Sequence, residues 1–188
     1  MSTSNTTIGL PLTNARRKDG SLVNSDFRNG SLKLVVAPSG SFLLQGETPQ
    51  VAGYNVSDTV ILPLVAPANF VPGNSALSIS LRVALVSSMP NQSLSNANCA
   101  LSVLRPNDDG SATAITVSTE PQALPAASQV AAPSYSQLTF DIDGSSINPG
   151  DELLVAVQIQ VRENGPVHSY ALISLAQLVA AVQNYQTA

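Results

Sequence analysis

The sequence predicts an all-β fold: an antiparallel two-sheet sandwich, preferably a jelly roll, with an extended N-terminal arm. Two long stretches alternate apolar residues with other types almost without exception, and each follows a Pro-Gly turn. Strict alternation places one face of a strand on a core. Many shorter strand-like runs lie between turn residues, which is typical of two packed antiparallel sheets. The alternating residues are Leu77, Ile79, Leu81, Val83 and Leu85 after Pro72-Gly73, and Leu153, Val155, Val157, Ile159 and Val161 after Pro149-Gly150.

Length and composition predict one domain with an unusual surface. A chain of 188 residues can bury a substantial core. Charged residues make up only 11% of it, against a usual fraction of about 25%. Its solubility must therefore come from Ser, Thr, Asn and Gln. A polar but uncharged surface favours packing against copies of the same chain or a large neighbour, because interface cores are poor in charge.

The basic residues gather near the N-terminus. Residues 1–33 hold five basic and two acidic side chains, whereas residues 34–188 hold three basic and ten acidic ones. We therefore divide the chain into an extended arm, 1–30, and a single jelly-roll domain, 31–188. The arm should contact an acidic partner surface through Arg16, Arg17, Lys18 and Arg28. Nucleic acid is a poorer partner, because the basic run is short and lacks interleaved aromatic residues.

The first half of the body reads as a series of strands. Alternation over 32–36 and the apolar run 42–44 predict two of them. Residues 59–65 read as a strand that contains Pro63, which cannot donate to a ladder, so we expect an edge strand or a bulge. A long strand over 76–86 follows. Another at 98–104 stops at the turn cluster 105–110.

The second half adds a hairpin partner at 112–118 and strands at 138–142, 152–161 and 167–174. Residues 119–134, rich in proline and alanine, predict an irregular crossing between the sheets of a Greek key. The tail 175–183 reads as a short helix, because Leu175, Leu178, Val179 and Val182 have helical spacing. An immunoglobulin-like sandwich is the alternative, but the chain has no tryptophan and no pair of cysteines.

Cysteine and histidine offer little chemistry. Cys99 is the single cysteine, so no internal disulfide can form, and its apolar run predicts a buried, inert thiol. His168 is the single histidine, and alone it makes neither a normal zinc site nor a good general base.

Four acidic residues gather around one predicted turn: Asp141, Asp143, Asp151 and Glu152. Such clusters can bind calcium or hydrolyse glycosides, but Gly144 comes too early for a calcium loop and the terminal glutamate is missing. Asp151 has a simpler role, since it can accept backbone N–H bonds in the Pro149-Gly150 turn. Asp108-Asp109-Gly110 reads as a hairpin turn. We therefore predict no catalytic, cofactor or metal site, and no enzyme.

The segment around this turn carries one family resemblance. Leu138–Ile142 followed by Ile147–Val157 has the pattern x-F-x-I … P-G-D-x-L-x-V. Over about residues 138–161 it resembles β-sandwich structural proteins of bacteriophage virions, of the capsid decoration or cement type. The resemblance implies a jelly roll that binds a major capsid protein.

The leading hypothesis is therefore a non-enzymatic virion protein that stabilises the capsid surface as a homotrimer. It would be made in the host cytoplasm, since the N-terminus lacks the basic and apolar regions of a secretory signal. A capsid, spike or head-fibre subunit is one alternative. A carbohydrate-binding module is an alternative of another class, although aromatic residues for a sugar platform are few. A calcium-dependent adhesin is a third.

Overall fold

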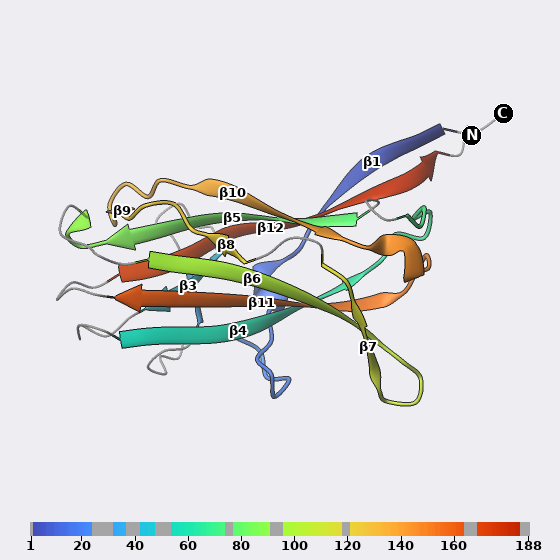
Figure 1. The fold of residues 1–188 in the computed structure, drawn as a ribbon, viewed down its shortest axis with the longest axis horizontal. Helices are drawn as coiled ribbons and strands as arrows, with labels where there is room; N and C mark the ends of the chain where they lie inside the picture. The colour runs from blue at the N-terminus through green and yellow to red at the C-terminus, as the bar shows by residue number, and fades with distance from the viewer. Residues whose placement is uncertain are drawn as a thin grey trace.

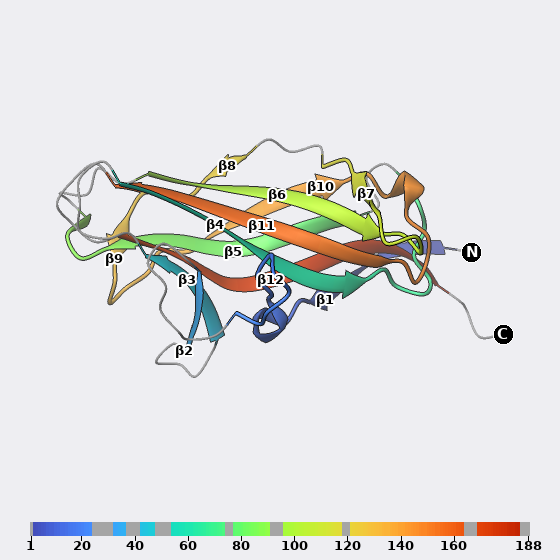
Figure 2. The same ribbon diagram turned by 90° about the horizontal axis from the view of Figure 1, so that it is seen from below.

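A computed structural model describes residues 2–23, 32–36, 42–47, 54–73, 77–90, 96–117, 121–163 and 169–184. Its strands form two layers that run along the long axis of the molecule (Figures 1 and 2). The predicted two-sheet antiparallel sandwich is confirmed. No helix among these residues is long and apolar enough to cross a membrane.

The larger sheet has seven strands and the smaller has five, within the described part of the chain. The path of the larger sheet is β10-β5-β12-β3-β2, with β1 beside β12 and β9 beside β5. The path of the smaller sheet is β4-β11-β6-β7, with β8 beside β6. The larger sheet comprises β1 (Ser2–Gly9), β2 (Lys33–Val36), β3 (Phe42–Glu47), β5 (Leu77–Ser87), β9 (Ser128–Gln129), β10 (Ser136–Ile142) and β12 (Ser169–Asn184). The smaller comprises β4 (Tyr54–Val65), β6 (Asn96–Pro106), β7 (Ala112–Ile115), β8 (Gln122–Ala123) and β11 (Glu152–Glu163).

The core lies between the two sheets, where the alternating residues of β5 and β11 meet. All ten alternating positions in the two predicted strands are buried. In β10, Leu138 and Phe140 pack on the same core from the neighbouring register positions of β5. Cys99 is also buried, and desolvation raises the pKa of its thiol from 9.0 to about 12.

Two expectations about connections hold. The proline strand β4 lies at the edge of the smaller sheet, where the missing N–H of Pro63 costs least. The predicted crossing also changes sheets: β8 pairs with β6 in the smaller sheet, and β9 pairs with β5 in the larger one.

The predicted C-terminal helix is wrong. Residues 175–183 belong to β12, which pairs with β5 on one side and with β1 on the other. A register shift between Ile173 and Leu175 changes which side chains face the core. The backbone N–H and C=O groups of this segment form hydrogen bonds with β1 and β5. This pairing on both sides stabilises the strand more than the helical spacing of its apolar residues favours a helix.

The described part of the predicted arm lies against the sandwich. β1 extends the larger sheet, and a short 3-10 helix, η1 (Leu12–Asn14), follows it. Arg16 then forms a two-way backbone bridge with Ile61 at the edge of the smaller sheet. This segment therefore connects both sheets along one side, while the proposed boundary at residue 30 stays a prediction.

Candidate functional site

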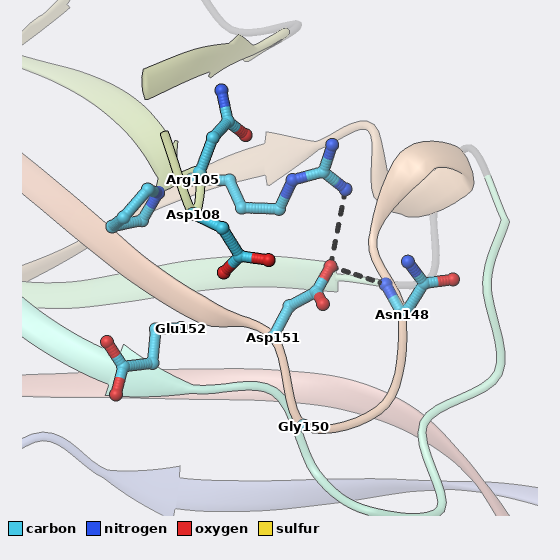
Figure 3. Close-up of a pocket in the computed structure, with 8 residues that line it drawn as sticks. Arg105, Asp108, Asn148, Gly150, Asp151 and Glu152 are labelled. Atoms are coloured by element: carbon cyan, nitrogen blue, oxygen red, sulfur yellow. Dashed lines mark hydrogen bonds and ion pairs between the residues drawn. The ribbon is translucent and has the colours of Figure 1, made fainter. Parts of the chain in front are cut away.

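A polar hollow of about 660 Å³ lies at the end of the sandwich that carries both the hairpin turn after β6 and the turn before β11. Figure 3 shows that its side chains come from these two turns, which are far apart in the sequence. The lining residues are Arg105, Pro106, Asn107, Asp108, Asn148, Gly150, Asp151 and Glu152.

The turn at residues 148–151 shapes one wall of the hollow. Gly150 has a φ of 84°, a conformation that glycine adopts without a steric cost. Its N–H donates to the carbonyl of Ala66, and the N–H of Ala66 donates to the carbonyl of Asp151. The carboxylate of Asp151 accepts the N–H of Asn148 at 2.8 Å. The wall is thus fixed by backbone bonds to a neighbouring segment as well as by its own turn.

Arg105 joins the opposite wall to this turn. Its guanidinium lies 3.3 Å from the carboxylate of Asp151 and also donates to the carbonyl of Ser146 (Figure 3). Both side chains are about three-quarters buried, so water screens this ion pair less than a surface pair. Two protein acceptors hold one nitrogen of the guanidinium, and this fixes the direction of its remaining N–H donors.

Three other polar side chains of the hollow are open to a ligand, whereas the amide of Asn107 is hydrogen-bonded to Ser111 and Thr113. Asp108 and Glu152 are exposed, and neither carboxylate has a side-chain hydrogen bond or ion pair among the described residues. Asn148 is exposed as well, and its amide can both donate and accept. The hollow therefore combines fixed N–H donors with carboxylate acceptors, a set that matches the hydroxyl groups of a polyol.

A smaller depression of about 430 Å³ lies on the outer face of the smaller sheet. Its floor contains Ala100, Ser102 and Ala156, which neighbour one another across β6 and β11. Lys18 reaches it from the N-terminal segment, and Gln158 stands beside Thr59 on β4. Four of its nine lining residues have polar side chains, against six of eight in the hollow, so it is the weaker candidate for a polar ligand.

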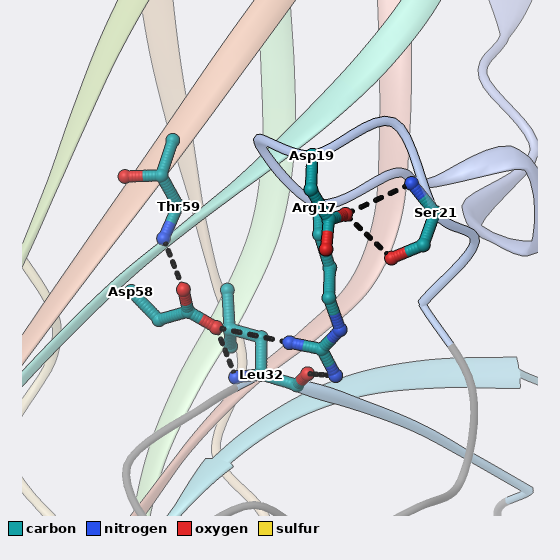
Figure 4. A network of polar contacts seen from close by, with 6 residues as sticks. All are labelled: Arg17, Asp19, Ser21, Leu32, Asp58 and Thr59. Carbon is teal, nitrogen blue, oxygen red and sulfur yellow. Dashed lines mark hydrogen bonds and ion pairs between the residues drawn. The ribbon is translucent and has the colours of Figure 1, made fainter.

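The predicted contact residues of the arm are not alike. Arg17 is partly buried: its guanidinium lies 3.9 Å from the carboxylate of Asp58 and donates to the carbonyl of Leu32 at 3.3 Å (Figure 4). Arg16 is exposed and donates to the carbonyl of Gly20, and Lys18 is exposed beside the depression. Arg28 lies outside the described residues.

The remaining residues singled out from the sequence are dispersed. Pro72 and Gly73 precede β5, and the carbonyl of Gly73 lies beside the buried Gly144. The carboxylate of Asp143 accepts the N–H of Ser145, whereas Asp141 points outward from β10. Within the described part of the chain no three His, Cys, Asp or Glu side chains are grouped as metal ligands. His168 lies outside it.

Comparisons with known proteins give matches in structure alone. No family model and no curated protein matches the sequence. The CBM22-1 xylan-binding domain of Paenibacillus barcinonensis Xyn10C is 16% identical, with a TM-score of 0.44 over 98% of this chain and 100% of its own. The xylan-binding module CBM15 is 13% identical, with a TM-score of 0.46 over 96% and 100%. An adhesin domain of Lys-gingipain from Porphyromonas gingivalis is 12% identical, with a TM-score of 0.40 over 95% and 98%.

These matches are carbohydrate-binding modules and an adhesin domain, which corrects the hypothesis of a bacteriophage capsid decoration protein; the expected capsid partner and homotrimer find no support in them. The resemblance to virion proteins, over about residues 138–161, includes the Pro149-Gly150-Asp151 turn between two strands. The structure accounts for that turn by local hydrogen bonding of Asp151, which any β-sandwich can use. With TM-scores below 0.5, no residue role is carried over from these proteins.

Proposed function

We propose that this protein is a non-catalytic glycan-binding module whose ligand site is the polar hollow at the end of the sandwich. The observation that carries the proposal is the donor and acceptor set of the hollow: a guanidinium fixed by Asp151, two open carboxylates and an open amide. Sugar hydroxyls both donate and accept, so a ring can be held by several such groups at once.

The charge of the hollow indicates a neutral glycan. Asp108, Asp151 and Glu152 outnumber the one cation, Arg105, that lines it. A uronate or a sulfated sugar would bring a further negative charge next to these carboxylates, which costs free energy. No aromatic ring lines the hollow, so we expect binding that depends on hydrogen bonds and is of modest affinity.

Affinity electrophoresis against soluble neutral and acidic polysaccharides, followed by calorimetry on any hit, tests the proposal. We expect retardation by a neutral polysaccharide and a roughly tenfold loss of affinity in Asp108→Asn, since a hydrogen bond to a charged group contributes about 1.5 kcal/mol. Asp141→Asn, which makes the same change in charge on β10 away from the hollow, is the matched control. No retardation by any polysaccharide, or an equal loss in both variants, would reject the site.

A further inference from the structure

β1 is a sheet edge without the usual protection. Residues 2–9 contain no charged residue and no proline, and seven of the eight residues are exposed. Edge strands are normally guarded by charge, proline, shortness or a covering segment. β4 has Pro63 and the bridge from Arg16, and β2 and β7 are each only four residues long. Figure 1 shows β1 on the outside of a ribbon that it forms with the end of β12.

The register with β12 identifies the backbone groups on the open side of β1. The N–H of Leu10 donates to the carbonyl of Ala176 at 2.8 Å, which continues the ladder from Gly9 opposite Gln177. In an antiparallel ladder the residues that exchange hydrogen bonds alternate along the strand. The even-numbered residues of β1 therefore bond to β12, and Thr3, Asn5, Thr7 and Gly9 direct their N–H and C=O groups away from it. No described strand pairs with that side.

We propose that this edge pairs with β1 of a second copy of the chain in an antiparallel, two-fold symmetric ladder. One register uses all four outward residues: Thr3 lies opposite Gly9 of the second copy, and Asn5 opposite Thr7. Each such pair exchanges two hydrogen bonds, so eight outward N–H and C=O groups of each copy find partners. Thr6 then faces Thr6 of the second copy on the two-fold axis.

A second copy suits this edge better than another partner would. The four outward residues lie symmetrically about Thr6, so their N–H and C=O groups can all bond to the same residues of a second copy. Ser and Thr side chains also pair favourably across strands. The chain carries a net charge of −4, yet β1 carries none, so two copies meet where their repulsion is least. The pairing occupies the β1 edge of each copy, so no β1 edge is left for a third copy and the assembly closes as a dimer. The surface buried between the two copies is that of a single strand on each, so we expect a dimer that dissociates on dilution.

Cysteine cross-linking tests the register. In the proposed ladder the two Thr6 residues form a pair without mutual hydrogen bonds, with Cα atoms about 4.5 Å apart, within the range that a disulfide spans. Thr6→Cys should therefore give a covalent dimer on mild oxidation, while the buried Cys99 stays reduced. Ser2→Cys is the control, since the two copies of residue 2 lie at opposite ends of the ladder. A Thr6→Cys protein that stays monomeric, or equal cross-linking of both variants, would overturn the register.

Sedimentation of the native sequence tests the dimer itself. Asn5→Pro removes an outward N–H without removing a bond to β12, so it should abolish a concentration-dependent dimer. Its melting temperature, measured in parallel, establishes that it folds. A native chain that remains monomeric at millimolar concentration, or an Asn5→Pro variant that dimerises equally well, would overturn the proposal. Neither result bears on glycan binding.

Discussion

Two aspartates, Asp109 and Asp143, hold turns of this protein through the same local contact. The carboxylates of Asp109 and Asp143 each accept hydrogen bonds from the serine two residues later. These bonds, from the Ser111 and Ser145 side chains first and then from their backbones, lower the pKa of both carboxyls below the ordinary 3.8. The contact favours the ionised form, so its contribution to stability is present above the unfolded pKa and is lost as the pH falls through the folded pKa.

Asp143→Asn tests this dependence, because asparagine keeps an acceptor at the start of η3 (Gly144–Ser146) but cannot ionise. We expect the variant to melt a few degrees below the native sequence at pH 6. The difference should shrink below about pH 4, since the native carboxylate then becomes protonated. Thermal melts from pH 2.5 to 7 measure it. A difference that stays constant over this range would show that ionisation is not the cause.

At the scale of single residues, the sequence was informative only about local chemistry. The capacity of Asp151 to accept a backbone N–H follows from its position in a Pro-Gly turn, and Asn148 supplies that N–H. Its ion pair with Arg105 crosses 46 positions of sequence. That contact depends on how the β6 hairpin and the turn before β11 meet at the end of the sandwich, and no local pattern encodes it.

At the scale of the element, alternation defines which face of β5 is buried. Leu81 is fully buried between the sheets, whereas Arg82 is exposed and its guanidinium lies 4.7 Å from the ring centroid of Tyr135. We expect Leu81→Asp to cost more than about 4 kcal/mol, because it buries an unpaired charge. Arg82→Asp should cost about 1 kcal/mol, the value of an exposed cation–π contact.

Chemical denaturation of both variants measures the difference. Similar unfolding midpoints would mean that the phase of β5 is reversed, since a strand shifted by one residue exchanges its two faces.

β12 shows why alternation did not predict every strand. Its buried positions after the register shift are Ala176, Leu178, Ala180 and Val182. Two of these are alanines, which also suit a helix, and the larger apolar residues by chance follow helical spacing. The bulge between Ile173 and Leu175 also interrupts the pattern. Partner strands on both sides decide the structure of this segment, and they come from the start of the chain (β1) and from its middle (β5).

At the scale of the whole molecule, the N-terminal segment is part of the core. Leu10, Leu12, Ala15 and Val23 belong to the main hydrophobic cluster between the sheets. The backbone of Val23 also donates to the carbonyl of Ala15, which holds the 16–22 turn closed. We therefore expect this segment to unfold together with the sandwich.

Substitutions at two adjacent residues test this cooperativity. Val23 is 3% exposed and Leu22 is 54% exposed. Val23→Asp should lower the free energy of unfolding by about 3 kcal/mol or more, and Leu22→Asp by less than about 0.5 kcal/mol. Hydrogen exchange in β4 and β5 should accelerate in the first variant alone. Unchanged exchange in these strands would mean that residues 10–23 open independently of the body.

The ladder between β1 and β12 also determines how the molecule responds to tension. It places Ser2 opposite Asn184, so both ends of the described chain leave the same end of the sandwich. A load applied between these two residues pulls across the ladder and opens it one pair at a time, as a zipper opens. A load along β5, held between β10 and β12, would instead shear many hydrogen bonds together. We therefore expect the ladder between β1 and β12 to open at a lower force, when the chain is pulled between these two residues, than the ladders that hold β5.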